Sequence, residues 1–159
     1  MDNYNLDKTV KKLVDEAIVK EIMSLKLAVK LIEAVEKKAQ EMDMRVVIAV
    51  SDASGRPVAV HCMDNAYHGS FDVALGKTYT ATAFQMSTKE LARLCQPGQD
   101  LYGLQFSNEG KVMILGGGEP LMVGNTMIGA LGVSGGSAAQ DTELAAYGRA
   151  ILKEVITCL

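Results

Sequence analysis

Two glycine-rich runs near the C-terminus decide the fold: Gly116-Gly117-Gly118-Glu119-Pro120, then Gly129-Ala130-Leu131-Gly132-Val133-Ser134-Gly135-Gly136 followed by Gln140-Asp141. Seven glycines stand in these runs among apolar residues that favour strands. Glycine loses much conformational entropy on folding, so this density indicates positive φ, or close approach by another backbone or a ligand. The region is the first candidate for a site, although its pattern names no reaction.

The composition describes a single domain, which we expect to span residues 1–159. Hydrophobic residues make up 48% of the chain, aromatic residues only 5%, and tryptophan is absent, so the core must consist of aliphatic residues and methionine. The net charge is −3 and no basic block occurs. Nucleic-acid binding needs a concentrated positive face, so we expect no nucleic-acid partner.

The cysteines and the N-terminus indicate a cytoplasmic protein. Cys62, Cys95 and Cys158 are widely spaced, without the Cys/His clusters of a structural zinc site, so we expect no metal. An odd number of cysteines fits a reducing compartment. The first six residues are polar and no apolar run approaches the length of a membrane span, so we expect no secretory segment and no membrane partner.

Hydrophobic periodicity predicts five helices and about five strands. The helices cover 7–22, 25–42, 70–82, 88–95 and 138–157, and the strands cover 45–51, 57–63, 111–115, 119–123 and 126–134. Asp52-Ala53-Ser54-Gly55 and Gly124-Asn125 are short turns typical of hairpins, which favour antiparallel pairing. We therefore predict an α+β fold in the order ααββααβββα, with an antiparallel sheet flanked by helices.

The triple glycine Gly116–Gly118 has two interpretations. It can be a tight turn or bulge between two strands. It can also present free backbone N–H groups as a nest for an anion or carboxylate. It matches neither the phosphate-binding P-loop nor the dinucleotide fingerprint.

Asp64, Ser70 and Lys77 form a second candidate site. Asp64 follows a strand, Ser70 is a candidate cap of the next helix, and Lys77 lies two turns further along that helix. Asp64 can also be a simple turn residue. Lys77 stands on a face of small and apolar residues, where a lysine either extends its ammonium to solvent or pairs with Asp64 or a ligand carboxylate.

His61 and His68 are the two histidines of the chain. Each can be an axial ligand to haem or a general base, or an ordinary surface or half-buried histidine. No nucleophile elbow, zinc-protease motif or Cys/His nucleophile pair is present.

Several motifs together resemble the GlcG/HbpS-like family. The motifs are Val50–Gly55, Met63–Ala66, Ser70–Ala74, Lys77–Ala81, Gly116–Gly118 with Pro120, Gly129–Gly135 and Gln140-Asp141. They cover the chain from about residue 24 to the C-terminus. The pattern looks most similar to the C-terminal domain of microcompartment corrinoid adenosyltransferases, which Gln96–Gln99 and Leu101–Gln105 also resemble.

This resemblance implies a homo-oligomer such as an octamer, a haem or related tetrapyrrole cofactor, and association with a bacterial microcompartment. The candidate ligand-binding residues are Asp64, Ser70, Lys77, Gly116, Gly117, Gly118, Gln140 and Asp141, which we expect to meet in one partly apolar cleft if the second hairpin packs beside the first. The adenosyltransferase-linked members are thought to bind haem through a histidine in the N-terminal helix, and Leu25–Asp43 contains none.

Three functions follow from these observations. The first is an oligomeric accessory protein of a corrinoid or diol pathway that binds a small anion or a tetrapyrrole. The second is a small enzyme that uses Asp64 and Lys77 as an acid/base pair on a carboxylate or carbonyl substrate. The third is a purely structural oligomer. Strands that are apolar on both sides predict exposed patches, and hence an assembly larger than a dimer.

Overall fold

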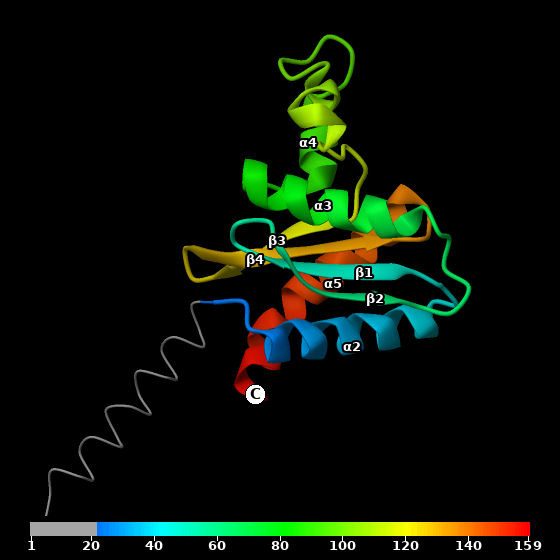
Figure 1. Cartoon of the computed structure of the whole chain (residues 1–159), viewed down its shortest axis with the longest axis vertical. Coiled ribbons are helices and arrows are strands. Elements are labelled where there is room, and N and C mark those ends of the chain that lie inside the picture. Colours follow the sequence, from blue (N-terminus) through cyan, green and yellow to red (C-terminus); the bar gives the residue numbers. More distant parts are fainter. Residues whose placement is uncertain (1–21) are drawn as a thin grey trace, which may run out of the picture.

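The structure, a computed structural model, describes residues 22–159 (Figure 1). The predicted helix over 7–22 lies outside the described residues except for its last position. The elements are α2 (Leu25–Glu41), β1 (Val47–Asp52), β2 (Pro57–Cys62), α3 (Ser70–Phe84), α4 (Thr88–Leu94), 3₁₀ turns at Leu104–Phe106 and Asn108–Gly110, β3 (Gly118–Val123), β4 (Thr126–Ser134) and α5 (Ala138–Thr157).

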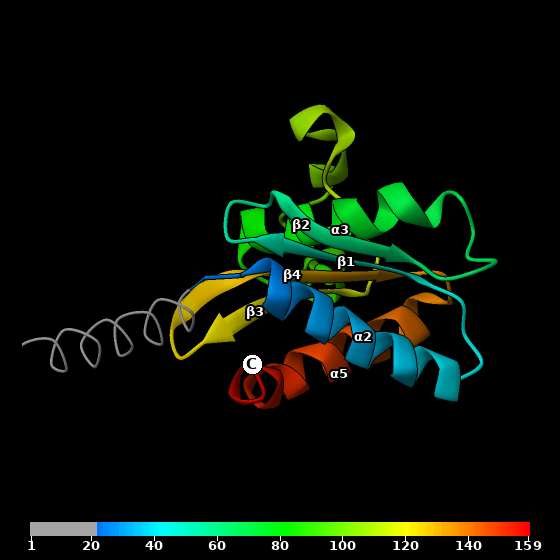
Figure 2. The same ribbon diagram turned by 60° about the horizontal axis from the view of Figure 1, so that its bottom comes forward.

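The strands form one antiparallel sheet in the order β2-β1-β4-β3 (Figure 2). The α+β class and the antiparallel pairing are therefore confirmed. The sheet has four strands within the described residues, so the prediction of about five strands, and with it the order ααββααβββα, is wrong in one element.

The segment 111–115 is the predicted strand that does not form. Its backbone bonds to a helix instead, because the Met113 N–H donates to Thr80 Oγ1 at 2.8 Å. The neighbouring strand β3 also lacks the free backbone N–H groups that a further strand would need at these positions. On the outer edge of β3 the Gly118 N–H donates to Thr88 Oγ1, and Pro120 has no N–H to donate. The apolar sequence of 111–115 instead places Val112 in a small cluster against Leu91 of α4.

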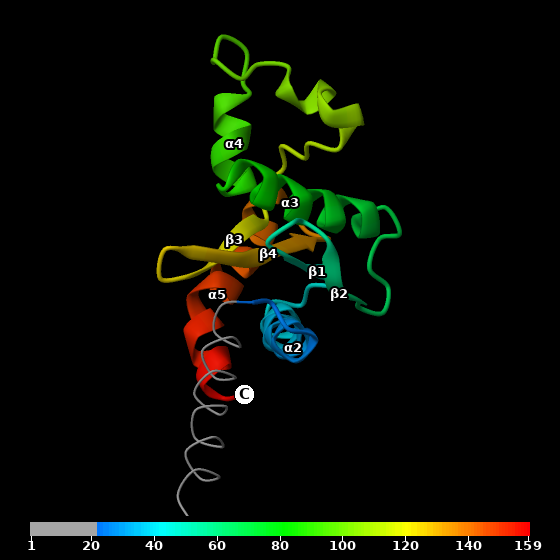
Figure 3. The same ribbon diagram turned by 60° about the vertical axis from the view of Figure 1, so that its left-hand side comes forward.

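Helices cover both faces of the sheet. Helices α2 and α5 lie on one face, where they form the main core with β1 and β4, and α3 lies on the other (Figure 3). The backbone of α3 comes close to β4 at Gly132, where an added Cβ would touch the Ala74 carbonyl oxygen. This close approach is one reason for the glycines in the second run.

The predicted ends of several elements agree with the structure. Ser24 caps α2 by accepting a hydrogen bond from the Leu27 N–H, and α5 spans the predicted 138–157. The Gly124-Asn125 hairpin turn joins β3 to β4. Ser70 is a correction, since it is the first residue of α3, Gly69 occupies the N-cap position, and no side chain caps this end.

A projecting arm extends beyond α3, made of α4 and residues 95–111 (Figure 1). Its own small core contains Leu91, Cys95 and Val112, and it exposes Tyr102 and Phe106. None of the helices within residues 22–159 has the length and apolar character needed to cross a membrane.

Candidate functional site

A buried ion pair joins α3 to α5. The Lys77 Nζ donates to Asp141 Oδ2 at 2.8 Å and to the Val133 carbonyl oxygen at 2.6 Å. The side chains of Lys77 and Asp141 are 1% and 5% exposed. The ammonium is thus held by a carboxylate from the first turn of α5 and by the end of β4, within the protein interior.

Asp141 connects this ion pair to the glycine run after β4. Its Oδ1 accepts a hydrogen bond from the Gly136 N–H at 2.9 Å, so both carboxylate oxygens have partners. Gln140 has another task, because it completes a capping box with Ser137 at the start of α5. The Gln140-Asp141 pair therefore serves the helix N-terminus and the buried lysine, respectively.

The triple glycine is filled by protein. Gly117 has φ +111°, and an added Cβ would lie 2.7 Å from Asp141 Cβ and 3.0 Å from Lys77 Nζ. An added Cβ at Gly116 would touch Thr142 Oγ1, and one at Gly118 would touch the Thr88 side chain. These glycines allow α3, α5 and the Gly116–Gly118 turn to converge on the Lys77 ammonium.

Burial dominates the electrostatics of this cluster. Desolvation lowers the pKa of Lys77 below its usual value, and the hydrogen bond and charge of Asp141 oppose that shift. A buried pair contributes little net stability, but removal of one partner leaves an unpaired buried charge. Through these contacts Lys77 on α3 is joined to α5 and to the end of β4.

The predicted grouping of Asp64 with Lys77 is corrected by this geometry. Lys77 pairs with Asp141 rather than with Asp64, so the proposed acid/base pair is not assembled. Asp64 is exposed and lines a separate cleft. Ser70 is buried at the start of α3, and no ligand role of these residues is tested by the structure.

An open cleft of about 480 Å³ lies where α2 ends and β2 leaves the sheet. It is lined by Glu36, Gln40, Asp43, Met44, Arg45, Cys62, Met63, Asp64 and Asn65. The lining combines carboxylates, amides, one guanidinium and three sulfur atoms. Its volume falls in the range of small-molecule sites.

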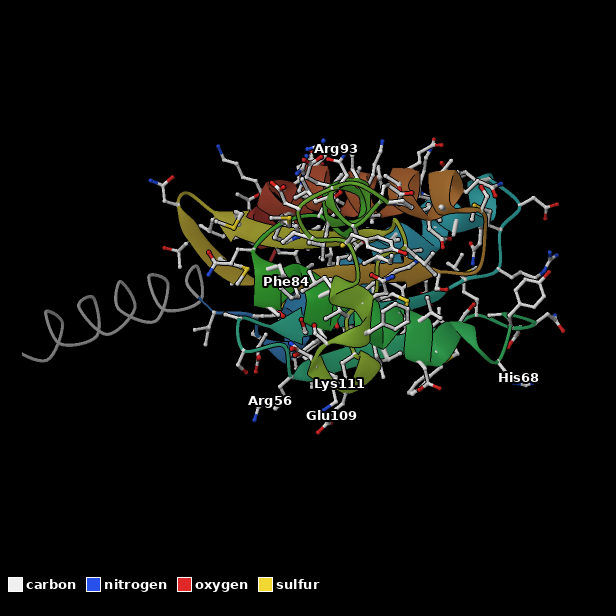
Figure 4. All side chains as sticks on the ribbon, turned by 90° about the horizontal axis from the view of Figure 1, so that it is seen from above. Arg56, His68, Phe84, Arg93, Glu109 and Lys111 are labelled. Atoms are coloured by element: carbon white, nitrogen blue, oxygen red, sulfur yellow. The ribbon has the colours of Figure 1, made fainter. Side chains whose placement is uncertain are left out.

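His61 lies on β2 beside this cleft. Its Nδ1 is 3.0 Å from Oε1 of Glu36, which is one of the lining residues, and its side chain is half-buried. No described residue bonds to its Nε2. A histidine that is oriented by a carboxylate through one nitrogen can bind a metal through the other. His68, in contrast, is exposed on the loop before α3 and points away from the molecule (Figure 4).

The donors around the cleft fit haem. His61 Nε2, the exposed thiol of Cys62 and the thioether of Met63 are all of the types that ligate haem iron. Arg45 is 55% exposed and can pair with a propionate, since its contact to Asp43 is long, at 3.7 Å. Within residues 22–159 no group of three or more His, Cys, Asp or Glu side chains could by itself hold a metal ion.

Several of these residues were missed by the sequence reasoning. Glu36 and Gln40 fall inside the predicted helix over 25–42, and Arg45 is the first residue of the predicted strand over 45–51. Only the folded structure brings Glu36, Gln40 and Arg45 into the same cleft as Asp64. The position of Arg45 directly before a buried apolar strand was the available signal, because charged residues at strand ends often line clefts.

The comparisons with known proteins agree on one family. The family model for "Haem degrading protein HbpS-like" matches residues 23–150. An uncharacterised 15.0 kDa protein from the dhaT–dhaS intergenic region of Citrobacter freundii is 42% identical over 123 residues, 77% of this chain and 87% of that protein. The corrinoid adenosyltransferase PduO of Salmonella typhimurium is 39% identical over 72% of this chain, which spans only 34% of that enzyme.

Solved structures share the fold. Klebsiella pneumoniae protein ORFY superposes with a TM-score of 0.79 at 38% identity, covering 86% of this chain and 92% of that one. A complex of PduOC with haem gives a TM-score of 0.78 at 36% identity, over 81% of this chain and 94% of that one. The matched residues include the buried ion pair and the cleft, and they place this chain in the HbpS-like family.

Proposed function

We propose that this protein is an oligomeric accessory protein that binds haem or a related tetrapyrrole in the cleft beside His61. The observation that supports this most strongly is the donor set. His61, Cys62 and Met63 are consecutive, and they lie on or beside the open cleft, whose lining also includes Arg45. A relative of 36% identity was crystallised with haem.

Different residues of the cleft would bind the iron and the propionates of haem. His61, oriented by Glu36, or the sulfur of Cys62 would supply an axial ligand, and Arg45 would pair with a propionate. Haem bound there would supply redox chemistry or ligand sensing. Asp64 adds a negative charge to the cleft lining and would repel the propionates from its own side.

The biological setting belongs to the same proposal. The relatives include a protein from the dhaT–dhaS intergenic region and a corrinoid adenosyltransferase. We infer a cytoplasmic role in corrinoid-dependent diol or glycerol use, in association with a bacterial microcompartment. The exposed Tyr102 and Phe106 on the projecting arm support self-association, as apolar patches of this kind mark interfaces.

Titration with haemin under reducing and oxidising conditions tests the proposal. We expect a saturable Soret band whose position changes in His61→Ala or Cys62→Ala, according to which residue is the ligand. His68→Ala is the matched control, since its side chain points away from the cleft, and it should keep the wild-type spectrum.

Absence of a saturable Soret band in wild-type protein would overturn haem binding. An unchanged spectrum in both His61→Ala and Cys62→Ala would show that haem binds elsewhere. Persistence of the assembly without any bound tetrapyrrole would then favour a structural oligomer.

A further inference from the structure

The two edges of the sheet differ in their capacity to pair. On the β3 edge the Gly118 N–H is bonded to Thr88, Pro120 has no donor, and the register shifts between Leu121 and Met122. Proline and irregular register are the usual protection of an edge strand. This edge is closed to a further strand.

The β2 edge is open from Val60 to Cys62. The Met63 N–H donates to the Val46 carbonyl oxygen, and Ile48 pairs with His61 in the same register. Residues alternate in an antiparallel ladder, so the backbone groups of Val60 and Cys62 point away from β1. Within residues 22–159 no group bonds to these outward donors and acceptors.

We propose that β2 pairs with β2 of a second copy of this chain, in antiparallel orientation about a two-fold axis near His61. The proposal specifies the surface behind the self-association proposed above, and this strand pairing does not require haem. Val60 of each copy would face Cys62 of the other, which uses all four outward N–H and C=O groups of each strand. The result is one continuous eight-stranded sheet.

Charge explains why the partner is a second copy. Arg56 precedes β2 and its side chain is 80% exposed; its Nε donates to Asp52 Oδ2 at 3.1 Å, and its other guanidinium nitrogens have no ion-pair partner within residues 22–159. The exposed Asp64 follows β2. Figure 4 shows Arg56 at one end of the β2 side of the molecule and His68, from the loop after Asp64, at the other. Antiparallel pairing would bring Arg56 of each copy toward the Asp64 end of the other, and β2 itself has no lysine, arginine or acidic residue to oppose it.

The register shifts between Val50 and Ser51, whose partners are Ala59 and Pro57, so Val58 is skipped and the pairing is limited to the last residues of β2. A short two-fold ribbon gives few hydrogen bonds, so side-chain contacts of the flanking helices would have to add to it. The interface would also place the second copy at the mouth of the cleft, since Cys62 and Asp64 belong to both surfaces.

Hydrogen–deuterium exchange and light scattering test the pairing in the intact protein. We expect the Val60 and Cys62 amides of the wild-type assembly to exchange slowly. Val60→Pro removes an outward donor but no β1–β2 hydrogen bond, and Cys62→Lys adds an edge lysine at an exposed position. Each variant should lower the mass of the assembly at least twofold. The control Met122→Lys, on the closed edge, should keep it.

Fast exchange at both amides in an intact assembly, or an unchanged mass in Cys62→Lys, would overturn the proposed interface while self-association stands. A monomeric wild-type protein would overturn both. Haem binding is read separately, by the haemin titration of the wild-type protein, because Cys62→Lys also alters a residue of the cleft. If Val60→Pro does not fold, Cys62→Lys and the wild-type exchange decide the matter.

Discussion

The buried Lys77–Asp141 cluster and the open cleft around Asp64 contain the two halves of one predicted site. In the cluster every charged atom has a protein partner, and the glycines leave no room for a ligand. In the cleft the charged groups are exposed and loosely paired. The difference separates a glycine-rich, charged motif whose groups are bonded to the protein itself from a cleft whose charged groups are accessible to solvent.

The largest expected effect is that of Lys77→Met. A ligand-binding lysine would leave the fold intact, whereas loss of one partner of a buried pair costs about 3–5 kcal/mol of stability. We expect urea unfolding to show a loss of this size. The double variant Lys77→Met/Asp141→Leu should recover part of it, because no buried charge then lacks a partner. A stable single variant would contradict the structural role of the pair.

Gly117→Val should destabilise the protein by about 2–4 kcal/mol, because it combines positive-φ strain with overpacking. The matched control is Gly103→Val, at φ +91° with no atom within 4 Å of an added Cβ, where strain acts alone. Thermal unfolding of both variants separates the two causes. Equal losses in the two would show that the convergence on Lys77 is looser than described.

Glu119 provides a smaller, pH-dependent effect. Burial raises the pKa of this carboxyl, and the positive charges of Arg149 and Lys89 only partly oppose that shift. Its Oε2 lies 3.2 Å from Arg149 Nη1 without forming a hydrogen bond. The folded state therefore holds the Glu119 proton more tightly than the unfolded state does.

The consequence is that this residue lowers stability as pH rises through the window that begins near its unfolded pKa of 4.5. One proton accounts for a slope of at most about 1.4 kcal/mol per pH unit. The measurement is the free energy of unfolding of wild type and of Glu119→Gln from pH 4 to pH 8. The value for wild type minus that for the variant should fall with this slope as pH rises. Parallel curves would mean that Glu119 is solvated.

Asp64→Asn should have the smallest effect on stability, within about 0.5 kcal/mol, because the side chain is exposed. Its effect should appear in ligand affinity instead, through the charge at the cleft mouth. A loss of stability like that of Lys77→Met would erase the contrast between the two regions. Urea unfolding measures the stability of the Asp64→Asn and Lys77→Met variants, and haemin titration of the same preparations measures their haemin affinity.

The sequence predicts much of the fold because local signals agree there. Ser24 and the capping box of α5 mark helix starts, and turn residues mark both hairpins. It overpredicts a strand at 111–115, where an apolar pattern is satisfied by a satellite core and by Thr80 rather than by a ladder. Hydrophobic periodicity and composition do not predict which group will form hydrogen bonds with the backbone of a segment.

The candidate site is less accessible to sequence reasoning. Lys77 and Asp141 are 64 residues apart, and only the packing of α3 against α5 and β4 joins them. The resemblance to a family singles out both residues, but it does not separate a structural role from a binding role. The cleft residues Glu36 and Arg45 carry no local pattern that distinguishes them from an ordinary solvated face.

Paramagnetic haemin offers the most direct test of the division between the two regions. Methionine methyl groups labelled with ¹³C remain visible by NMR in large assemblies, and Met44 and Met63 line the cleft. Met113 packs near Gly76, one residue from Lys77 in the chain. We expect the Met44 and Met63 signals to broaden on addition of haemin while Met113 stays sharp, with zinc protoporphyrin as the diamagnetic control. Broadening centred on Met113, with Met44 and Met63 unaffected, would contradict the account.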